Sequence, residues 1–451
     1  MSTLCKKYLI VGAGRSGICS AQLLEKLGAD YVIFDGNTEL DKKEVLERIG
    51  TDRDVPFILG QVKDAELDGI DICVASPGVS LETDIMKKVI DCGIEVWSEI
   101  ELAYLHDKGR VIGITGTNGK TTTTSLTYEI VKAYNNNTLL VGNIEIPYTG
   151  RVSDSVQGGT TVAEISSFQL ETMRTFKPAV SAILNITPDH LDRHKTMENY
   201  GNIKKSIAGN QTEEDFCVLN FDDAVLRAFG KECKARVVYF SSKEKLSDGL
   251  YLDGDKIYIA KDGVSEVFIG TDEVNLVGVH NFENIMAAVA IAMSFGVPLD
   301  IIREVVKKFV AVAHRIEYVT TLNGVKYYND SKGTNTDAAI KAIDAMPSKT
   351  VLIAGGYDKK GDYDEWVSRF PGKVRKLVLI GQTRENIAAA CEKIGFRDYI
   401  FAESLQEAVE ICKKEAIDGD CCLLSPACAS WGMFKNYQQR GDMFKELVLA
   451  E

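Results

Sequence analysis

The sequence has little that would place the protein at a membrane or on nucleic acid. Its first residues, MSTLCKKYLIVGAG, pass directly into a predicted strand without the long apolar core of a signal peptide, and no apolar run is long enough to cross a bilayer. Lys and Arg number 52 against 65 Asp and Glu, a net charge of -13, which argues against broad binding to nucleic acid or an anionic membrane. We therefore expect a cytoplasmic protein with small-molecule ligands.

Patterns typical of zinc sites, disulfide frameworks and repeat proteins are also missing. The 11 cysteines show no paired C-x-x-C spacing and fall mostly within predicted strands and helices, so we expect reduced thiols in the core. We find no internal repeat and no low-complexity segment. These absences leave an ordinary globular protein, and its chemistry has to be sought in local motifs.

The most informative motif is GITGTNGKTTT, which begins at Gly113 after an apolar strand and opens a helix. Backbone N–H groups in such a loop surround phosphate oxygens, a lysine reaches the outer phosphates and a hydroxyl holds Mg2+. The spacing is imperfect, because the usual glycine five residues before Gly119 is replaced by Ile114. The alternative is an ordinary Gly-rich turn. The predicted triphosphate site consists of Gly116, Thr117, Asn118, Gly119, Lys120, Thr121 and Thr122.

A second glycine-rich turn, GAGRSG from Gly12 to Gly17, lies between the first predicted strand and its helix. It is a Rossmann-type fingerprint for a diphosphate attached to a ribose, which a dinucleotide and a UDP-linked molecule satisfy equally well. A further turn, SPGVS, ends another parallel strand, where ligands of open sheets gather. Simple loop geometry is the alternative for both. The predicted substrate residues here are Gly14, Arg15, Ser16, Gly17, Asp35, Ser76, Pro77 and Gly78.

Two segments after the triphosphate loop could hold metal. Glu164 closes a buried strand in VAEISSFQLE, where a carboxylate without a local partner needs a cation. NITPDHLDRH brings His190 and His194 close together, but no cysteine or HExxH spacing supports zinc. We therefore prefer Mg2+ with phosphate oxygens. The alternative for His190 is a hydrogen-bonded loop histidine.

Apolar runs alternate with helical patterns along all 451 residues, which predicts parallel sheets flanked by helices. The pattern restarts twice, so we predict an α/β protein of three domains. Residues 1–98 would form a Rossmann-like domain, residues 99–310 a P-loop ATPase-type domain with a mostly parallel sheet, and residues 311–451 a second Rossmann-like domain. Antiparallel hairpins are predicted at Asp253-Gly254 and Asn323-Gly324.

Several motifs, taken in order, resemble those of the Mur ligases of bacterial cell-wall synthesis: GTNGKTT, EISSFQLE, NITPDHLDRH, HNFEN, AHRIE, NDSKGTN and SPACASW-x-MFKNYQQRGD. The resemblance covers essentially the whole chain, and the last motif is similar to that of the members that add D-glutamate. It implies an ATP-dependent ligase that joins D-glutamate to UDP-N-acetylmuramoyl-L-alanine through an acyl phosphate, for peptidoglycan precursors. The three domains would bind the UDP-sugar, ATP and the amino acid, and we expect a monomer.

The resemblance also implies residue roles. Lys120 would stabilise the transferred phosphoryl group, Thr121 and Glu164 would bind one Mg2+, His190 would bind a second, and Asn143 would contact the substrate near the γ-phosphate. Lys204 matches a lysine that the family carries as a carbamate, which would act as an anionic metal ligand; Lys205 is its rival, and a plain surface lysine is the other alternative.

For the remaining contacts, the resemblance assigns the adenosine and phosphates to Asn281, Asn284, Arg315 and Asp330, and D-glutamate to Thr334, Lys359, Ser430 and Tyr437. Two positions depart from the common pattern. Gly432 stands where an acidic residue is frequent, and Tyr437 where some members have phenylalanine. Neither departure disturbs the charged contacts, and both leave open small differences in how the amino acid is packed.

Other functions stay open at this point. Related ligases add L-alanine, meso-diaminopimelate or L-lysine, and a more distant relative adds glutamate to folate. A dinucleotide-dependent oxidoreductase would explain GAGRSG but gives GTNGKTT no role. A P-loop switch or transporter component would leave both the N-terminal glycine turn and SPACAS without a role.

Overall fold

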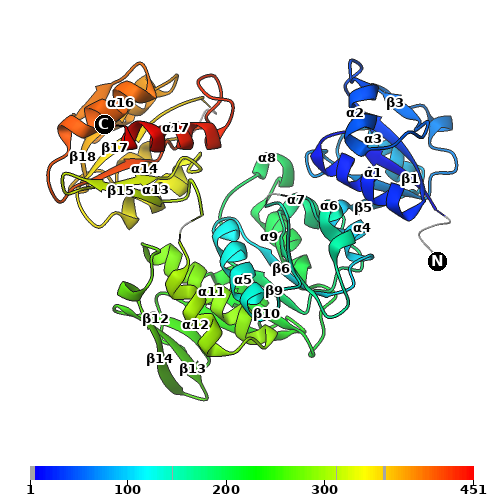
Figure 1. Ribbon diagram of the computed structural model, residues 1–451, viewed down its shortest axis with the longest axis horizontal. Coiled ribbons are helices and arrows are strands. Elements are labelled where there is room, and N and C mark those ends of the chain that lie inside the picture. The colour runs from blue at the N-terminus through cyan, green and yellow to red at the C-terminus, as the bar shows by residue number, and fades with distance from the viewer. Residues whose placement is uncertain (1–5, 145, 311, 359–361, 451) are drawn as a thin grey trace. The chain divides into compact units, whose positions relative to one another are not determined.

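The computed structural model describes residues 6–144, 146–310, 312–358 and 362–450, in which the strands form three sheets (Figure 1). The chain divides into two compact units, Met1–Ile269 with Asn284–Val306 and Gly270–Glu283 with Lys307–Glu451. The first two sheets belong to the first unit and the third sheet to the second. In the part of the chain described, no helix combines the length and the apolarity needed to span a bilayer.

The first sheet is fully parallel, with strand order β3-β2-β1-β4-β5. The order reverses direction beside β1, so the C-terminal ends of β1 and β4 open a crevice of the kind where α/β sheets bind ligands. Its strands are β1 (Lys7–Val11), β2 (Asp30–Asp35), β3 (Phe57–Leu59), β4 (Ile72–Ala75) and β5 (Glu95–Ser98). Its helices are α1 (Arg15–Leu27), α2 (Lys42–Ile49), α3 (Asp84–Asp91) and α4 (Glu99–Tyr104), with the 3-10 turn η2 (Asp64–Glu66).

The second sheet has the order β14-β13-β12-β11-β10-β9-β6-β8-β7, and β6 to β11 pair in parallel. Its strands are β6 (Arg110–Thr115), β7 (Thr138–Gly142), β8 (Thr160–Glu164), β9 (Val180–Ile183), β10 (Phe216–Asn220), β11 (Arg236–Ser241), β12 (Gly249–Asp253), β13 (Lys256–Lys261) and β14 (Val264–Gly270). The central position of β6 places the turn that follows it in the middle of the sheet's C-terminal edge.

Two helices of ten or more residues follow the last strand of this sheet in the chain. They are α11 (Val279–Phe295) and α12 (Leu299–Lys308). The other helices are α5 (Lys120–Tyr134), α6 (Tyr148–Arg151), α7 (Ser167–Leu170), α8 (Leu191–His194), α9 (Met197–Lys205) and α10 (Ala224–Phe229), with 3-10 turns η3 (Val152–Asp154), η4 (Ser206–Ala208) and η5 (Thr271–Glu273). The hairpin predicted at Asp253-Gly254 is confirmed, because β12 and β13 pair antiparallel across it.

The third sheet has the order β15-β16-β20-β17-β18-β19, and only its β15–β16 edge is antiparallel. That edge is the second predicted hairpin, in which Asn323 (φ 49°) and Gly324 (φ 75°) form a primed turn. The strands are β15 (Glu317–Leu322), β16 (Val325–Asn329), β17 (Thr350–Ala354), β18 (Val374–Leu379), β19 (Tyr399–Phe401) and β20 (Cys421–Leu424). The helices are α13 (Thr336–Ala345), α14 (Asp364–Val367), α15 (Arg384–Lys393), α16 (Leu405–Glu415) and α17 (Tyr437–Leu449).

The α/β class with mostly parallel sheets in three domains is thus confirmed. Each sheet has its own buried apolar side chains, such as Ile10 in β1, Ile112 in β6 and Leu352 in β17, which are at most 1% exposed. Parallel strands buried on both faces read as continuous apolar runs, which explains why the sequence revealed them. The boundaries predicted near residues 98 and 310 stay predictions.

Candidate active site

The triphosphate loop predicted from GTNGKTT lies between β6 and the first turn of α5. Gly116 (φ 154°) and Gly119 (φ 83°) adopt backbone angles that other residues rarely take. A Cβ on Gly119 would lie 2.2 Å from Oδ1 of Asn284 on α11, so the glycine also makes room for that amide. The loop therefore sits at the positive end of a 15-residue helix, as anion binding requires.

The segment after β9 holds this loop in place. The Thr117 amide donates to the Asn185 carbonyl oxygen (3.0 Å), and the Asn118 amide donates to Oδ1 of Asn185 (2.8 Å). Nδ2 of Asn185 returns a hydrogen bond to the Asn118 carbonyl (3.1 Å). The Thr117 hydroxyl lies 3.2 Å from that of Tyr200 on α9. Asn185 and Tyr200 were missed as site residues, although NITPDH, which begins at Asn185, was itself recognised.

Two lysines converge on one carbonyl of the loop. Nζ of Lys120 donates to the Gly116 carbonyl (2.8 Å) and the Thr117 carbonyl (2.9 Å), and Nζ of Lys204 donates to the same Gly116 oxygen (2.8 Å). Lys204 is only 1% exposed. Burial, reinforced by the charge of Lys120, holds the pKa of Lys204 well below its usual value. The rival Lys205 lies elsewhere, with Nζ 5.9 Å from the ring of Phe229.

Glu164 ends β8 between the ends of β6 and β7, and its side chain is 2% exposed. Its Oε1 accepts a hydrogen bond from Nδ2 of Asn143 (2.8 Å), which brings these two predicted catalytic residues together. Its Oε2 is buried without a hydrogen-bond partner. An uncompensated carboxylate oxygen in such a place is costly, and a divalent cation would satisfy it. The residues present therefore fit the predicted Mg2+.

His190 precedes α8 in the left-handed region (φ 54°), a conformation that is uncommon for residues other than glycine. Its Nε2 lies 3.4 Å from Oδ2 of Asp189, and its ring centroid lies 4.8 Å from that of Phe168. Thr121, the fourth predicted metal ligand, is buried in the first turn of α5. Among the described residues, no group of three or more His, Cys, Asp and Glu side chains forms a ready metal site.

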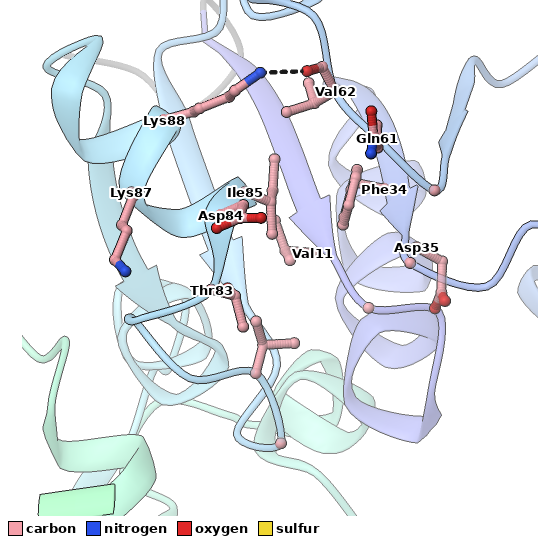
Figure 2. Close-up of a pocket in the computed structure, with 15 residues that line it drawn as sticks. Val11, Phe34, Asp35, Gln61, Val62, Thr83, Asp84, Ile85, Lys87 and Lys88 are labelled. Atoms are coloured by element: carbon pink, nitrogen blue, oxygen red, sulfur yellow. Dashed lines mark hydrogen bonds between the residues drawn. The ribbon is translucent and has the colours of Figure 1, made fainter.

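The first sheet carries a cavity of about 710 Å3 at the carboxyl ends of its strands (Figure 2). Asp35 and Gly78, both predicted substrate residues, line it together with Gly12. Asp35 also supports the glycine turn, because Oδ2 accepts the Ala13 amide (2.8 Å) and Oδ1 accepts the Asn37 amide (2.9 Å). The predicted contact of Asp35 with a ribose hydroxyl stays a prediction.

The other residues predicted at this cavity surround its glycine turn. The Ser76 hydroxyl donates to the Gly12 carbonyl (3.3 Å), and a Cβ on Gly17 would lie 1.8 Å from that same oxygen. Gly14 caps α1 beside Arg15 and Ser16, and Pro77 follows Ser76. The sequence missed Lys87 and Lys88, which reach the cavity from α3; Figure 2 shows the latter donating to the Val62 carbonyl.

In the second unit, Asp330 follows the end of β16, next to the end of β20. Oδ2 of Asp330 accepts the Ser425 hydroxyl (2.7 Å), and burial raises the pKa of Asp330 to about 7. The Tyr437 carbonyl accepts the Ser331 hydroxyl (2.8 Å). Arg440 is fully buried and donates to both oxygens of Ser331, a role that the sequence did not reveal.

The other residues predicted in the second unit are placed as follows. Thr334 is in the turn after Asp330, with its amide 2.9 Å from the Lys332 carbonyl, and Ser430 is buried after β20. Nδ2 of Asn281 donates to the Val277 carbonyl (2.8 Å), and the Arg315 amide donates to the Val312 carbonyl (3.0 Å). Lys359 lies outside the described residues.

A phosphate loop with two adjacent lysines, and a separate ligand cavity beside a Rossmann-type turn, define a nucleotide-dependent enzyme of the α/β class. Residues 6–98 match the MurD-like N-terminal domain of Mur ligases, residues 114–292 the Mur ligase middle domain, and residues 314–428 the Mur ligase glutamate ligase domain. The chain belongs to the Mur ligase family of ATP-dependent enzymes.

Relatives in bacteria are similar over the full length. The UDP-N-acetylmuramoylalanine--D-glutamate ligase of Lachnospira eligens is 54% identical over 98% of both chains, and that of Lachnoclostridium phytofermentans is 50% identical over 100% of this chain and 99% of its own. Among solved structures, the MurF ligase of Thermotoga maritima in complex with ADP has the same fold, with a TM-score of 0.60, 17% identity and 99% of both chains covered.

Proposed function

We propose that this protein is an ATP-dependent, ADP-forming ligase that joins D-glutamate to UDP-N-acetylmuramoyl-L-alanine in peptidoglycan precursor synthesis. The observation that carries the proposal is the full-length similarity to ligases of that name, at 54% and 50% identity. The site supports it, because the phosphate loop and the cavity of the first sheet provide for two different phosphorylated ligands. We place the reaction in the cytoplasm.

The reaction needs an activated carboxylate, because a carboxylate in water is a poor electrophile for an amine. An oxygen of the L-alanyl carboxylate attacks the γ-phosphorus of ATP, and the bond to the ADP oxygen breaks, which gives an acyl phosphate and ADP. The D-glutamate amine then attacks the acyl carbon and expels phosphate, and the amine loses its proton. Positioning and charge neutralisation supply most of the catalysis in such transfers. We assign them to Lys120 and the triphosphate loop of residues 116–122 at the start of α5.

We propose that two Mg2+ ions bind beside the loop, one held by Thr121 and Glu164 and the other by His190 and Lys204. When bound, the ions would neutralise charge on the transferred phosphoryl group. The unpartnered, buried Oε2 of Glu164 supports this assignment. Asn143 would orient Oε1 of Glu164 through its hydrogen bond. It would also contact the substrate near the γ-phosphate.

Carbamylation of Lys204 belongs to the same proposal. Its ammonium group would repel a metal ion, whereas addition of CO2 to the neutral amine would give an anionic oxygen ligand. Burial beside Lys120 supports a neutral amine at this position. We expect a carbamate signal in 13C NMR of the enzyme with labelled bicarbonate. A signal that persists unchanged in Lys204→Ala would remove the assignment.

The ligand assignments follow the sequence analysis and stay proposals. The UDP-sugar would occupy the cavity lined by Asp35 and Gly78, with the turns from Gly14 to Gly17 and from Ser76 to Gly78 around its phosphates. Asn281, Asn284, Arg315 and Asp330 would bind the nucleotide, and Thr334, Lys359, Ser430 and Tyr437 would bind D-glutamate. Domains of residues 1–98, 99–310 and 311–451 would carry these three tasks.

Phosphate release tests the proposal directly. With ATP, Mg2+ and UDP-N-acetylmuramoyl-L-alanine, the purified enzyme should release phosphate only when D-glutamate is added, and the product should gain one glutamyl residue by mass. Turnover with L-alanine, meso-diaminopimelate or L-lysine in place of D-glutamate would identify a different ligase of this family. Reduction of NAD without ATP would identify an oxidoreductase instead. Removal of Mg2+ with a chelator should abolish phosphate release, and its return should restore it.

A further inference from the structure

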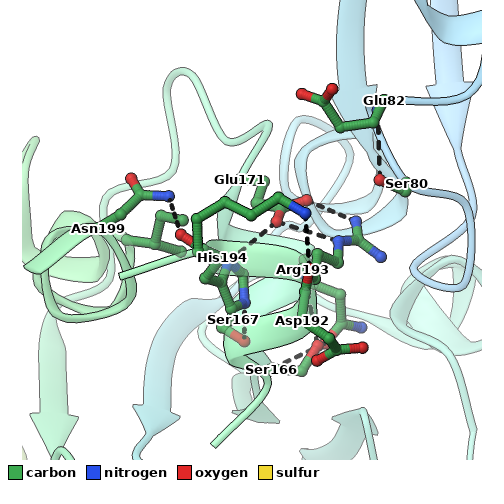
Figure 3. Close-up of polar contacts among 12 residues, drawn as sticks. Ser80, Glu82, Ser166, Ser167, Glu171, Asp192, Arg193, His194 and Asn199 are labelled. Atoms are coloured by element: carbon green, nitrogen blue, oxygen red, sulfur yellow. Dashed lines mark hydrogen bonds and ion pairs between the residues drawn. The ribbon is translucent and has the colours of Figure 1, made fainter. Parts of the chain in front are cut away.

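Arg193 on α8 connects two segments that carry different ligand assignments, and Figure 3 shows its ion pair with Glu171. Its Nη1 donates to the Pro77 carbonyl (2.8 Å) and its Nη2 to the Val79 carbonyl (3.1 Å). Nε and Nη2 both donate to the carboxylate of Glu171, which follows α7. The side chains of the pair are 13% and 10% exposed. The guanidinium therefore binds two backbone carbonyls of the SPGVS turn while it forms a largely buried ion pair with Glu171.

The carbonyls that Arg193 binds flank Gly78, the residue of the SPGVS turn that lines the cavity of the first sheet. Val79 lines the same cavity. The turn lies beyond the end of β4, where the Ser76 hydroxyl donates to the Gly12 carbonyl (3.3 Å) and the Val79 amide donates to the Ser76 carbonyl (2.9 Å). The guanidinium fixes it from the side of the second sheet.

Arg193 also contacts Phe168, which packs against the segment that contains His190. The guanidinium of Arg193 lies 4.2 Å from the ring centroid of Phe168, and the ring of His190 lies 4.8 Å from the same centroid. His194 anchors α8 further, with Nε2 2.9 Å from the Ser167 hydroxyl. Left-handed or strained backbone at His190 (φ 54°) and Lys195 (φ 70°) bounds the helix on both sides. The side-chain contacts of Arg193 and His194 therefore fix the orientation of this four-residue helix.

We propose that Arg193 is a positioning residue: paired with Glu171, it sets the distance between the SPGVS turn and the His190 segment. That distance decides whether the carboxylate of a UDP-linked substrate reaches the γ-phosphate of ATP. The inference rests on the proposed function and adds a residue that touches neither ligand. Effective catalysis requires reacting atoms within about 3–3.5 Å, so a small shift of the turn has a large effect.

The chemistry of arginine suits this position better than that of lysine. A planar guanidinium donates along several fixed directions, so it satisfies the two carbonyls and the carboxylate together. An ammonium group at the end of a flexible chain would have to choose among the same acceptors. The Arg193→Lys variant keeps the charge and removes the geometry, which makes it the sharper test.

The experiment compares Arg193→Lys and Arg193→Gln with a matched control, Arg227→Gln. Arg227 also pairs with a carboxylate (Glu244, 3.7 Å) and lies over an aromatic ring (Phe221, 5.0 Å). We expect Arg193→Gln to raise the KM for UDP-N-acetylmuramoyl-L-alanine at least tenfold, equivalent to about 1.4 kcal/mol, and to lower kcat as well. The KM for ATP should stay within twofold, and Arg193→Lys should be intermediate. The control should match the wild type.

Removal of one partner from a buried ion pair also destabilises a protein, so stability is measured in parallel. A lower melting temperature with unchanged kinetics per folded molecule would reduce Arg193 to a structural residue and overturn the inference. An equal rise in the KM for ATP and in the KM for UDP-N-acetylmuramoyl-L-alanine would also overturn the inference. If Arg193→Gln does not fold, Arg193→Lys decides by the same criteria. Glu171→Gln should reproduce the selective effect, and the double variant should be no worse than the worse single variant.

Calorimetry separates this inference from the proposed function. A wild-type enzyme that binds the UDP-substrate but does not turn over D-glutamate defeats the proposed reaction. In that case the affinity itself tests Arg193: tenfold weaker binding in Arg193→Gln supports the inference, and equal binding overturns it. A wild-type enzyme that binds no UDP-substrate defeats both.

Discussion

Two strand–turn–helix segments of the first unit contain similar glycine-rich turns with different surroundings. One joins β1 to α1 and the other joins β6 to α5. The second receives Nζ of Lys120 and Nζ of Lys204 at the Gly116 carbonyl. In the turn between β1 and α1, the carboxylate of Asp35 accepts a hydrogen bond from the Ala13 amide. This turn also borders a cavity. Both turns suit phosphate, but only the second has lysine Nζ atoms bonded to the turn itself.

The difference teaches that a local turn specifies an anion site, whereas distant segments specify what happens there. Asn185 and Lys204 reach the triphosphate loop from positions 67 to 88 residues further along the chain. Asn284 arrives from α11 and packs against Gly119. The cavity of the first sheet is completed instead by β2, β4 and α3, which bring a carboxylate, a glycine turn and two lysines.

Loss of Lys120 should produce the largest contrast between the two turns. We expect Lys120→Ala to lower the rate of acyl-phosphate formation by about 10²–10³-fold, because a preorganised charge beside the transferred group is lost. Binding of the UDP-substrate should stay within twofold in calorimetry. Equal loss of both properties would contradict the separation of the two ligand sites.

Gly17→Ala should damage the first turn through packing alone. The new Cβ would lie 1.8 Å from the Gly12 carbonyl oxygen, so β1 and α1 would have to move apart. We expect a loss of about 1–3 kcal/mol in the free energy of unfolding, measured by denaturant titration with a probe in the first sheet. An unfolding transition identical to that of the wild type would show that the close approach of Gly17 to the Gly12 carbonyl oxygen is not needed.

A smaller contrast comes from the matched pair Gly119→Ala and Gly14→Ala. Gly119 has φ 83° and its Cβ would meet Oδ1 of Asn284, so we expect roughly tenfold weaker ATP binding, within the about 1–3 kcal/mol of a strained backbone position. Gly14 has φ -72° with open space at its Cβ, so ATP binding should not change. Calorimetry of both variants with ATP checks this prediction. Equal affinities of the two variants for ATP would contradict it.

The sequence predicted much of the fold because local rules act within a few residues. Asn323 and Gly324 specify a primed turn, and that hairpin was found as predicted. Helix periodicity alone did not choose between Lys204 and Lys205. Adjacent helical side chains point about 100° apart, so only one can face the loop, and the packing of α9 decides which.

The amino-acid order by itself determined the strands, the glycine turns and the phosphate loop, because β propensity, backbone freedom at glycine and the helix dipole are local properties. The fold alone decided that Arg193 meets Pro77, 116 residues away, and that Arg440 meets Ser331, 109 residues away. Nothing local marks such partners, since a guanidinium accepts any well-placed carbonyl or carboxylate. Their pairing depends on how the sheets and helices pack, and that packing sums contributions from many buried side chains.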